Sequence, residues 1–175
     1  DELIEGLRLV MKNTGALKGY IALKNDYTSS ISILGSKLKG KSDVEVFPLN
    51  NFYPAGDEQI LLTEVTGKIV PEGGIPLNVG AVVSNVLTFV QIARAEKGEV
   101  VTSRAVTLVG EVKKPQVAEA PIGMLVSELL DLAIPSIPIE DIVVIDGGPM
   151  MGRIVDLDAV VNKTTSGLLF LAKDH

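Results

Sequence analysis

A short loop in the first half of the chain carries the densest set of groups suited to ligand binding. Gly56 allows close approach of a backbone, and the carboxylates of Asp57 and Glu58 can accept hydrogen bonds from sugar or ribityl hydroxyls. The loop begins near Tyr53 and follows a predicted buried strand. Open α/β sheets bind ligands beyond the carboxyl ends of such strands. The alternative is a capped helix start, because acidic residues also favour the first turn of a helix.

A second polar cluster begins an otherwise apolar predicted helix and consists of Ser84, Asn85 and Thr88. The free backbone N–H groups at a helix start attract anions such as phosphate. Ser and Asn are also preferred N-cap residues. The cluster therefore predicts either a phosphate contact or a helix cap, and the residues alone favour the cap.

Two segments near the end of the chain, one glycine-rich and one polar and ending in glycine, are further candidates. In Asp146–Gly152, three glycines flank Met150 and Met151. Methionines can pack on a partner or a flat cofactor, but they more often fill irregular gaps in a core, and we favour the core. The polar segment Lys163–Gly167 lacks the spacing of a phosphate-binding P-loop.

The composition excludes several function classes. The chain has 175 residues, of which 46% are hydrophobic, 22% charged and 4% aromatic, with a net charge of −6. An acidic chain with few aromatics does not predict a nucleic-acid surface. There is no cysteine, and the single histidine is His175, so thiolate or histidine catalysis and a metal site built on these ligands are not expected. No apolar run approaches the roughly 20 residues that span a bilayer. We expect a cytoplasmic protein with no direct membrane span.

Alternating strands and helices are expected to position the first two clusters. Leu3, Leu7 and Met11 mark one face of a helix. A strand over 19–23, a helix ending at Gly40 and a strand over 44–47 then form a βαβ unit with parallel strands. Further helices are expected from Gln59 to Thr66 and from Asn85 to Lys97. Asn25 and Asp26 are candidate caps for the helix after the first strand, and Pro48 is expected to end the second strand. The sequence predicts an α/β domain over residues 1–98.

The pattern changes after Gly98. Alternating apolar residues predict strands near Val106 and Val117, and a helix over 125–133 follows. An apolar strand over 142–145 and a final strand over 167–171 complete the second half. Strands combined with one helix predict a small α+β domain of the β-grasp kind over residues 102–173.

Several segments together resemble a known family of electron-transfer proteins. They are the loop 53–58, the segment 67–76, the run 83–86, the run 145–152 and the segment 163–167. The chain resembles the C subunit of the Rnf electron-transport complex, with propanediol-utilisation cobalamin reductases and proline reductase-associated electron-transfer proteins in the same family. It is more remotely similar to the flavin-binding 51-kDa subunit of respiratory complex I. The resemblance implies a partial Rossmann-like FMN-binding domain followed by a soluble-ligand-binding β-grasp domain.

The resemblance also implies roles for the candidate residues. Tyr53, Gly56, Asp57 and Glu58 match the family loop that lies along the flavin and nicotinamide. By the same match, Ser84, Asn85 and Thr88 lie near the flavin phosphate and ribityl chain. Leu87 departs from the complex I pattern, which usually has Glu there, so the details of that site do not transfer.

The implied parent protein is an NADH-linked flavoprotein oxidoreductase. It would pass electrons between NADH and ferredoxin-type clusters or a downstream reductase, within a complex of several subunits. The family's glycine-rich flavin loop and its [4Fe–4S] cysteines lie outside the matched segments. We therefore expect an excised central fragment that binds neither cofactor alone and is inactive by itself. Its parent would be cytoplasmic. A position at the periphery of a membrane complex or inside a microcompartment is compatible with this expectation. The alternative is a docking module without redox chemistry, with cobalamin as one candidate ligand of the β-grasp domain.

Overall fold

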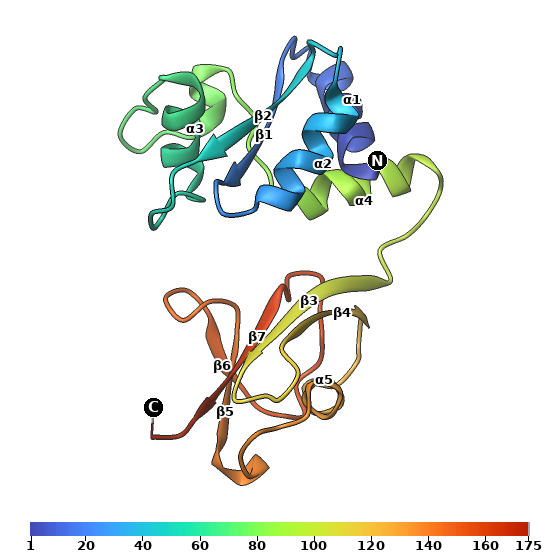
Figure 1. Ribbon diagram of the computed structural model, residues 1–175, viewed down its shortest axis with the longest axis vertical. Coiled ribbons are helices and arrows are strands. Elements are labelled where there is room, and N and C mark those ends of the chain that lie inside the picture. The colour runs from blue at the N-terminus through green and yellow to red at the C-terminus, as the bar shows by residue number, and fades with distance from the viewer. Residues whose placement is uncertain (175) are drawn as a thin grey trace. The chain divides into compact units, whose positions relative to one another are not determined.

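The computed structural model describes residues 1–174 and divides the chain into two compact units (Figure 1). The first unit spans Asp1–Val100 and the second begins at Val101. Both combine helices with strands, which confirms the mixed α/β class. Within the described part of the chain, no helix has the length and apolar character to cross a bilayer.

A parallel strand pair forms the centre of the first unit. Strand β1 (Gly19–Lys24) pairs with β2 (Val44–Leu49), and helix α2 (Thr28–Leu38) connects them. Gly19 pairs with Val44 and Lys24 with Leu49, so the strands are aligned over their whole length. The predicted βαβ unit is therefore confirmed. The aligned carboxyl ends bring the loops after β1 and β2 to one edge.

Three further helices complete the first unit: α1 (Glu2–Thr14), α3 (Glu58–Thr66) and α4 (Val86–Glu96), with a short 3-10 helix η1 (Pro76–Val79) after α3. Figure 1 shows α1, α2 and α4 on one side of the strand pair and α3 beside the other. The buried residues Ile4, Leu7 and Met11 of α1 pack with Ile21 of β1. α1 also lies very close to α4, since a Cβ on Gly6 would lie 1.7 Å from the carbonyl oxygen of Phe89.

The second unit is a five-stranded mixed sheet covered by one helix. Its elements are β3 (Ser103–Gly110), β4 (Gln116–Pro121), α5 (Val126–Ala133), η2 (Ile139–Asp141), β5 (Ile142–Asp146), β6 (Arg153–Val155) and β7 (Gly167–Ala172). The strand order is β4-β3-β7-β5-β6. β3 and β7 run parallel, and the other neighbours run antiparallel. Leu129 and Leu130 of α5 pack on Leu108 and Phe170, and all four side chains are buried.

Two local predictions were wrong, and one strand was missed. β2 continues through Pro48, because this strand has one partner and a proline is tolerated where no ladder hydrogen bond is required. Tyr27, rather than Asn25 or Asp26, precedes α2, and no side chain caps this helix. The short strand β6 was not predicted, since three residues are too few to show an alternating pattern.

Candidate functional site

The carboxyl edge of the β1–β2 pair is held together by contacts between its two loops. The backbone N–H of Asn25 donates to the carbonyl of Leu49, at 2.9 Å. The Asn51 side-chain amide donates to the Asp26 carboxylate. Asp26 is therefore used to join the two loops rather than to cap α2. This contact holds the β2–α3 loop, residues 50–57, beside the end of β1.

The β2–α3 loop exposes the groups singled out in the sequence. Tyr53 is 72% exposed, and Gly56, Asp57 and Glu58 are also exposed. A Cβ on Gly56 would meet nothing within 4 Å, so open space lies beside the backbone there. Ala55 is 1% exposed and anchors the loop from below. The loop therefore exposes an aromatic ring and two acidic side chains, while the buried Ala55 holds its backbone in place.

Asp57 is the N-cap of α3, and Glu58 is the first residue of the helix. The Asp57 Oδ1 atom accepts hydrogen bonds from the backbone N–H groups of Gln59 at 3.0 Å and Ile60 at 3.2 Å. Within residues 1–174, no hydrogen bond reaches Asp57 Oδ2 or the Glu58 carboxylate. The expected cap is present, and one oxygen of Asp57 stays available to a ligand.

The second cluster forms the start of α4. The Asn85 Oδ1 atom accepts from the Leu87 N–H at 2.9 Å, which makes Asn85 the N-cap. Ser84 is half-buried just before it, and Thr88 is exposed one turn into the helix. Across the described residues, no hydrogen bond or ion pair joins this cluster to the loop 53–58. The structure therefore does not join the two predicted groups through a polar contact.

Ion pairs in the first unit fasten its helices rather than form the site. Arg8 of α1 donates two hydrogen bonds to Asp43, at 2.6 and 2.9 Å, and holds the pKa of that carboxyl below its usual value. A hydrogen bond from Arg94 lowers the pKa of Glu2, and a bond to Glu5 raises the pKa of Lys97. These last two contacts join α1 to α4. They fasten the C-terminal end of α4, at Arg94 and Lys97, to the N-terminal half of α1.

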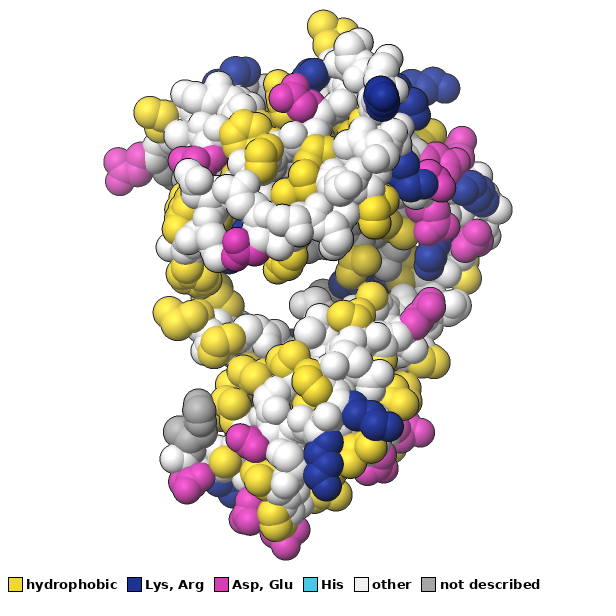
Figure 2. All heavy atoms as spheres, viewed as in Figure 1, with side chains coloured by type: hydrophobic (Ala, Val, Ile, Leu, Met, Phe, Trp, Pro, Cys, Tyr) yellow, Lys and Arg dark blue, Asp and Glu magenta, His cyan; other side chains and the backbone are white. Residues whose placement is uncertain are grey.

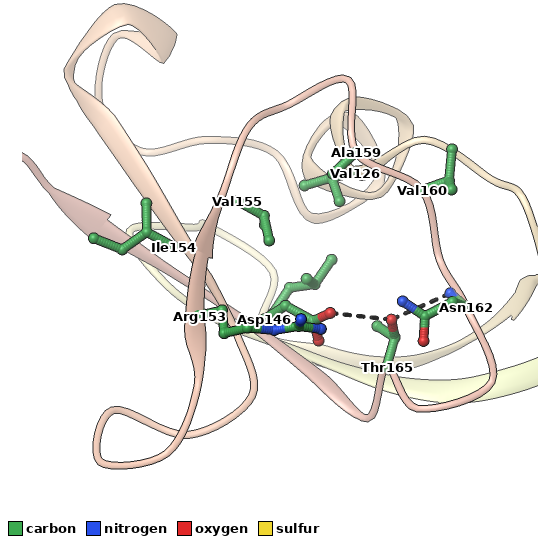
Figure 3. Close-up of a pocket in the computed structure, with 10 residues that line it drawn as sticks. Val126, Asp146, Arg153, Ile154, Val155, Ala159, Val160, Asn162 and Thr165 are labelled. Carbon is green, nitrogen blue, oxygen red and sulfur yellow. Dashed lines mark hydrogen bonds between the residues drawn. The ribbon is translucent and has the colours of Figure 1, made fainter.

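In the second unit, two segments that are separate in the sequence meet. Thr165, 1% exposed, donates from Oγ1 to Asp146 Oδ2 at 3.2 Å and accepts from the Asn162 N–H at 3.2 Å. Figure 3 shows these residues in one row along a cavity of about 240 Å³ that Arg153 also lines. The sequence analysis missed Arg153 and Asn162. The only signal for them in the sequence was their position, since Arg153 directly follows Gly152 and Asn162 directly precedes Lys163.

The interpretation of Met150 and Met151 as core residues was wrong. They are 74% and 87% exposed in the turn between β5 and β6. Gly147 has a φ of 110°, and a Cβ on Gly152 would lie 2.6 Å from the Gly148 carbonyl oxygen, so the turn is tight. A tight turn projects its central side chains away from the sheet. Figure 2 shows hydrophobic side chains reaching the surface of both units.

Comparison with protein families identifies the first unit. A family model described as the Nuo51 FMN-binding domain matches residues 1–94, more than half of the chain. The chain belongs to this FMN-binding family. A second model, the SLBB domain, matches residues 105–154. The resemblance inferred from the motifs is thus confirmed.

Curated relatives extend the match over the whole chain. The chain is 42% identical over 177 residues to cobalamin reductase PduS of Citrobacter freundii, covering 100% of this chain and 39% of that protein. It is 37% identical to the C subunit of the Na⁺-translocating ferredoxin:NAD⁺ oxidoreductase complex of Acetobacterium woodii, covering 99% of this chain and 40% of the relative. The chain therefore spans about two fifths of the length of these relatives.

A solved structure shares the fold of this member of the FMN-binding family. It is the crystal structure of an NAD⁺-reducing [NiFe]-hydrogenase in the H₂-reduced state, with a TM-score of 0.74 and 17% sequence identity. The match covers 99% of this chain and 36% of the hydrogenase chain. At this identity the likeness concerns the fold alone.

Proposed function

We propose that this chain is the central part of an electron-transfer flavoprotein and contributes the β2–α3 loop to an FMN site. The observation that carries the proposal is the exposed loop 53–58 at the carboxyl edge of the β1–β2 pair, in a chain of the FMN-binding family. Ligands bind at this edge in open α/β sheets. The family membership supplies the identity of the ligand.

The exposed groups of the loop suit a flavin nucleotide. The Tyr53 ring offers an apolar face, the space beside Gly56 admits a ring system, and Asp57 Oδ2 and Glu58 can accept hydrogen bonds from hydroxyls. Bound FMN would supply the ability to take up two electrons and release them one at a time. The carboxylates would disfavour added negative charge on the flavin and so lower its reduction potential.

The start of α4 suits the phosphate end of the same nucleotide. The Asn85 side-chain NH₂ group makes no hydrogen bond within residues 1–174, and the hydroxyls of Ser84 and Thr88 lie near the same helix start. Hydroxyl and amide groups at a helix start hydrogen-bond to phosphate oxygens. We propose that these three residues hold the phosphate and ribityl chain.

We further propose that residues 1–98 form a partial Rossmann-like FMN domain and residues 102–173 a β-grasp domain. The parallel β1–α2–β2 unit supports the first assignment. The strand order β4-β3-β7-β5-β6, with α5 across the sheet, supports the second. The SLBB match lies within this second range.

For the complete protein we propose electron transfer between NADH and ferredoxin-type clusters or a downstream reductase. The names of the relatives, a cobalamin reductase and one component of a ferredoxin:NAD⁺ oxidoreductase complex, support this reaction class. [4Fe–4S] clusters in the complete protein would need ligands from outside these residues, because the chain has no cysteine. One relative is named as a subunit of a complex, and we propose a cytoplasmic position at the edge of such a complex for the complete protein.

Replacing Gly56 tests the flavin proposal. Gly56 and Gly148 both have open space at the Cβ position and no positive φ, so Gly56→Val and its matched control Gly148→Val should fold equally well. In the complete gene product, Gly56→Val should weaken FMN binding at least about tenfold, about 1.4 kcal/mol, measured by quenching of flavin fluorescence. Equal affinity in both variants, or a complete protein that binds no FMN, would refute the proposal.

A second candidate function is docking of a ligand or partner by the second unit without redox chemistry of its own, with cobalamin as one candidate ligand. The exposure of Met150 and Met151 favours it, since large exposed apolar side chains are unfavourable in water. The double variant Met150→Ser, Met151→Ser should weaken assembly with partner subunits and leave FMN affinity unchanged. Unchanged assembly would exclude this role for the turn.

A further inference from the structure

The cavity in the second unit combines apolar walls with one polar end. Val126 of α5, Val155 of β6 and the segment containing Ala159 and Val160 surround it (Figure 3). Its volume of about 240 Å³ equals that of roughly eight liquid water molecules. The cavity therefore has room for a compact organic molecule. The polar groups that line the cavity determine the chemical class of molecule that it can bind.

The polar end has unused hydrogen-bonding capacity of both kinds. The Thr165 hydroxyl donates to Oδ2 of Asp146, and within residues 1–174 no hydrogen bond reaches Oδ1 of that carboxylate. The Asn162 Oδ1 atom accepts from the Thr164 N–H at 2.8 Å and from its hydroxyl at 2.6 Å, and the Asn162 NH₂ group donates to no group of the described residues. The Arg153 guanidinium forms no hydrogen bond and no ion pair within residues 1–174.

The polar end of the cavity carries two opposite charges on two separate side chains. Asp146 and Arg153 are directly opposite each other in the β5–β6 ladder, and the cavity is lined by both. Their formal charges of −1 and +1 give no net charge. An anionic ligand would meet the Asp146 carboxylate, and a cationic ligand would meet the Arg153 guanidinium. A neutral group that donates to one and accepts from the other avoids both costs.

We propose that this cavity binds a neutral ligand through a carboxamide group, with a small branched apolar body against Val126, Val155 and Ala159. The amide N–H groups would donate to Asp146 Oδ1, and the amide oxygen would accept from Arg153 or the Asn162 NH₂ group. This inference concerns the second unit only. It does not depend on the FMN proposal for the first.

Three probes of one shape and different charge test the proposal: isovaleramide, isovalerate and isoamylamine, which share an isobutyl group. Each is titrated into the isotopically labelled chain, and backbone amide shifts are followed by NMR. Ligands of this size bind in roughly the millimolar range. The amide should give saturable shifts at Val155, Asn162 and Thr165, with the acid and the amine at least about tenfold weaker. Equal binding of all three probes, or no saturable shift with the amide, would overturn it.

Charge-removing variants test the assignment of the polar groups. Asp146→Asn should shift the preference from the amide toward isovalerate, because only Arg153 stays charged. Arg153→Gln should shift it toward isoamylamine for the converse reason. Asp156→Asn and Lys163→Met are matched controls, since both residues are exposed in the same region and do not line the cavity. If the preference does not change in either lining variant, or changes equally in the controls, the assignment is wrong.

Discussion

The contact between α1 and α4 gives a sharp test of how the first unit is built. A Cβ on Gly6 would lie 1.7 Å from the Phe89 carbonyl oxygen, whereas real Cβ atoms essentially never approach within 3.0 Å. In Gly6→Ala the two backbones must therefore separate by at least the difference, 1.3 Å. A backbone carbonyl cannot rotate away as a side chain can. Overpacking of this kind costs about 1–3 kcal/mol, and the higher helix propensity of Ala returns only about 1 kcal/mol.

The matched control is Gly35→Ala in α2, where a Cβ meets nothing within 4 Å. This variant should stabilise the chain by about 0.5–1 kcal/mol through helix propensity alone. All three tyrosines lie in the first unit and the chain has no tryptophan, so tyrosine fluorescence reports the unfolding of that unit. Each kcal/mol shifts the Tm of a unit this size by about 4–8 °C. Gly6→Ala should lower the Tm and Gly35→Ala should raise it. A Gly6→Ala variant as stable as Gly35→Ala would refute the close contact, because both variants gain the same helix propensity.

Two further predictions concern single side chains of the first unit. Asp57→Ala should cost about 1 kcal/mol because two N–H groups of α3 lose their acceptor, whereas Asp57→Asn should cost little, since Asn caps as well; equal urea midpoints for the two variants would contradict the cap. Because Arg8 lowers the pKa of Asp43 in the folded chain, this carboxyl stabilises folding above its unfolded pKa, and that contribution is lost as the pH falls through the folded value. The urea midpoint should therefore fall less in Asp43→Asn than in the wild type between about pH 7 and about pH 3; identical pH profiles would show that the pair contributes nothing.

The sequence predicted the elements whose signals are local and repeated. Buried residues of α5 recur at helical spacing, and Gly67 ends α3 in the left-handed conformation with a φ of 71°, as a C-terminal glycine should. The β1–α2–β2 unit followed from two apolar runs separated by one helix, because a helical crossover between neighbouring strands favours a parallel pair. The helix signals lie within about 15 residues of sequence, and the β1–α2–β2 signal lies within one continuous stretch from Gly19 to Leu49.

What the sequence could not predict depends on contacts between distant residues. The neighbours of Asp26 predict a helix cap, but its partner is Asn51 in another loop. Thr165 and Asp146 are joined only because β7 pairs with β5, which no local pattern reveals. The hydrophobicity of Met150 and Met151 predicts a core position, although the tight turn that carries them leaves both side chains exposed.

The β2–α3 loop illustrates why the two interpretations of its acidic residues are compatible. A carboxylate has two oxygens, and the cap at α3 occupies one oxygen of Asp57. The cap fixes the side-chain rotamer, so the second oxygen points in one direction and loses no further conformational entropy when a ligand hydrogen-bonds to it. Asn85 has the same division, with its oxygen bonded to Leu87 and its NH₂ group without a hydrogen bond among the described residues. Capping at Asp57 and Asn85 is therefore compatible with the proposed ligand contacts, because it leaves one group of each side chain preorganised for them.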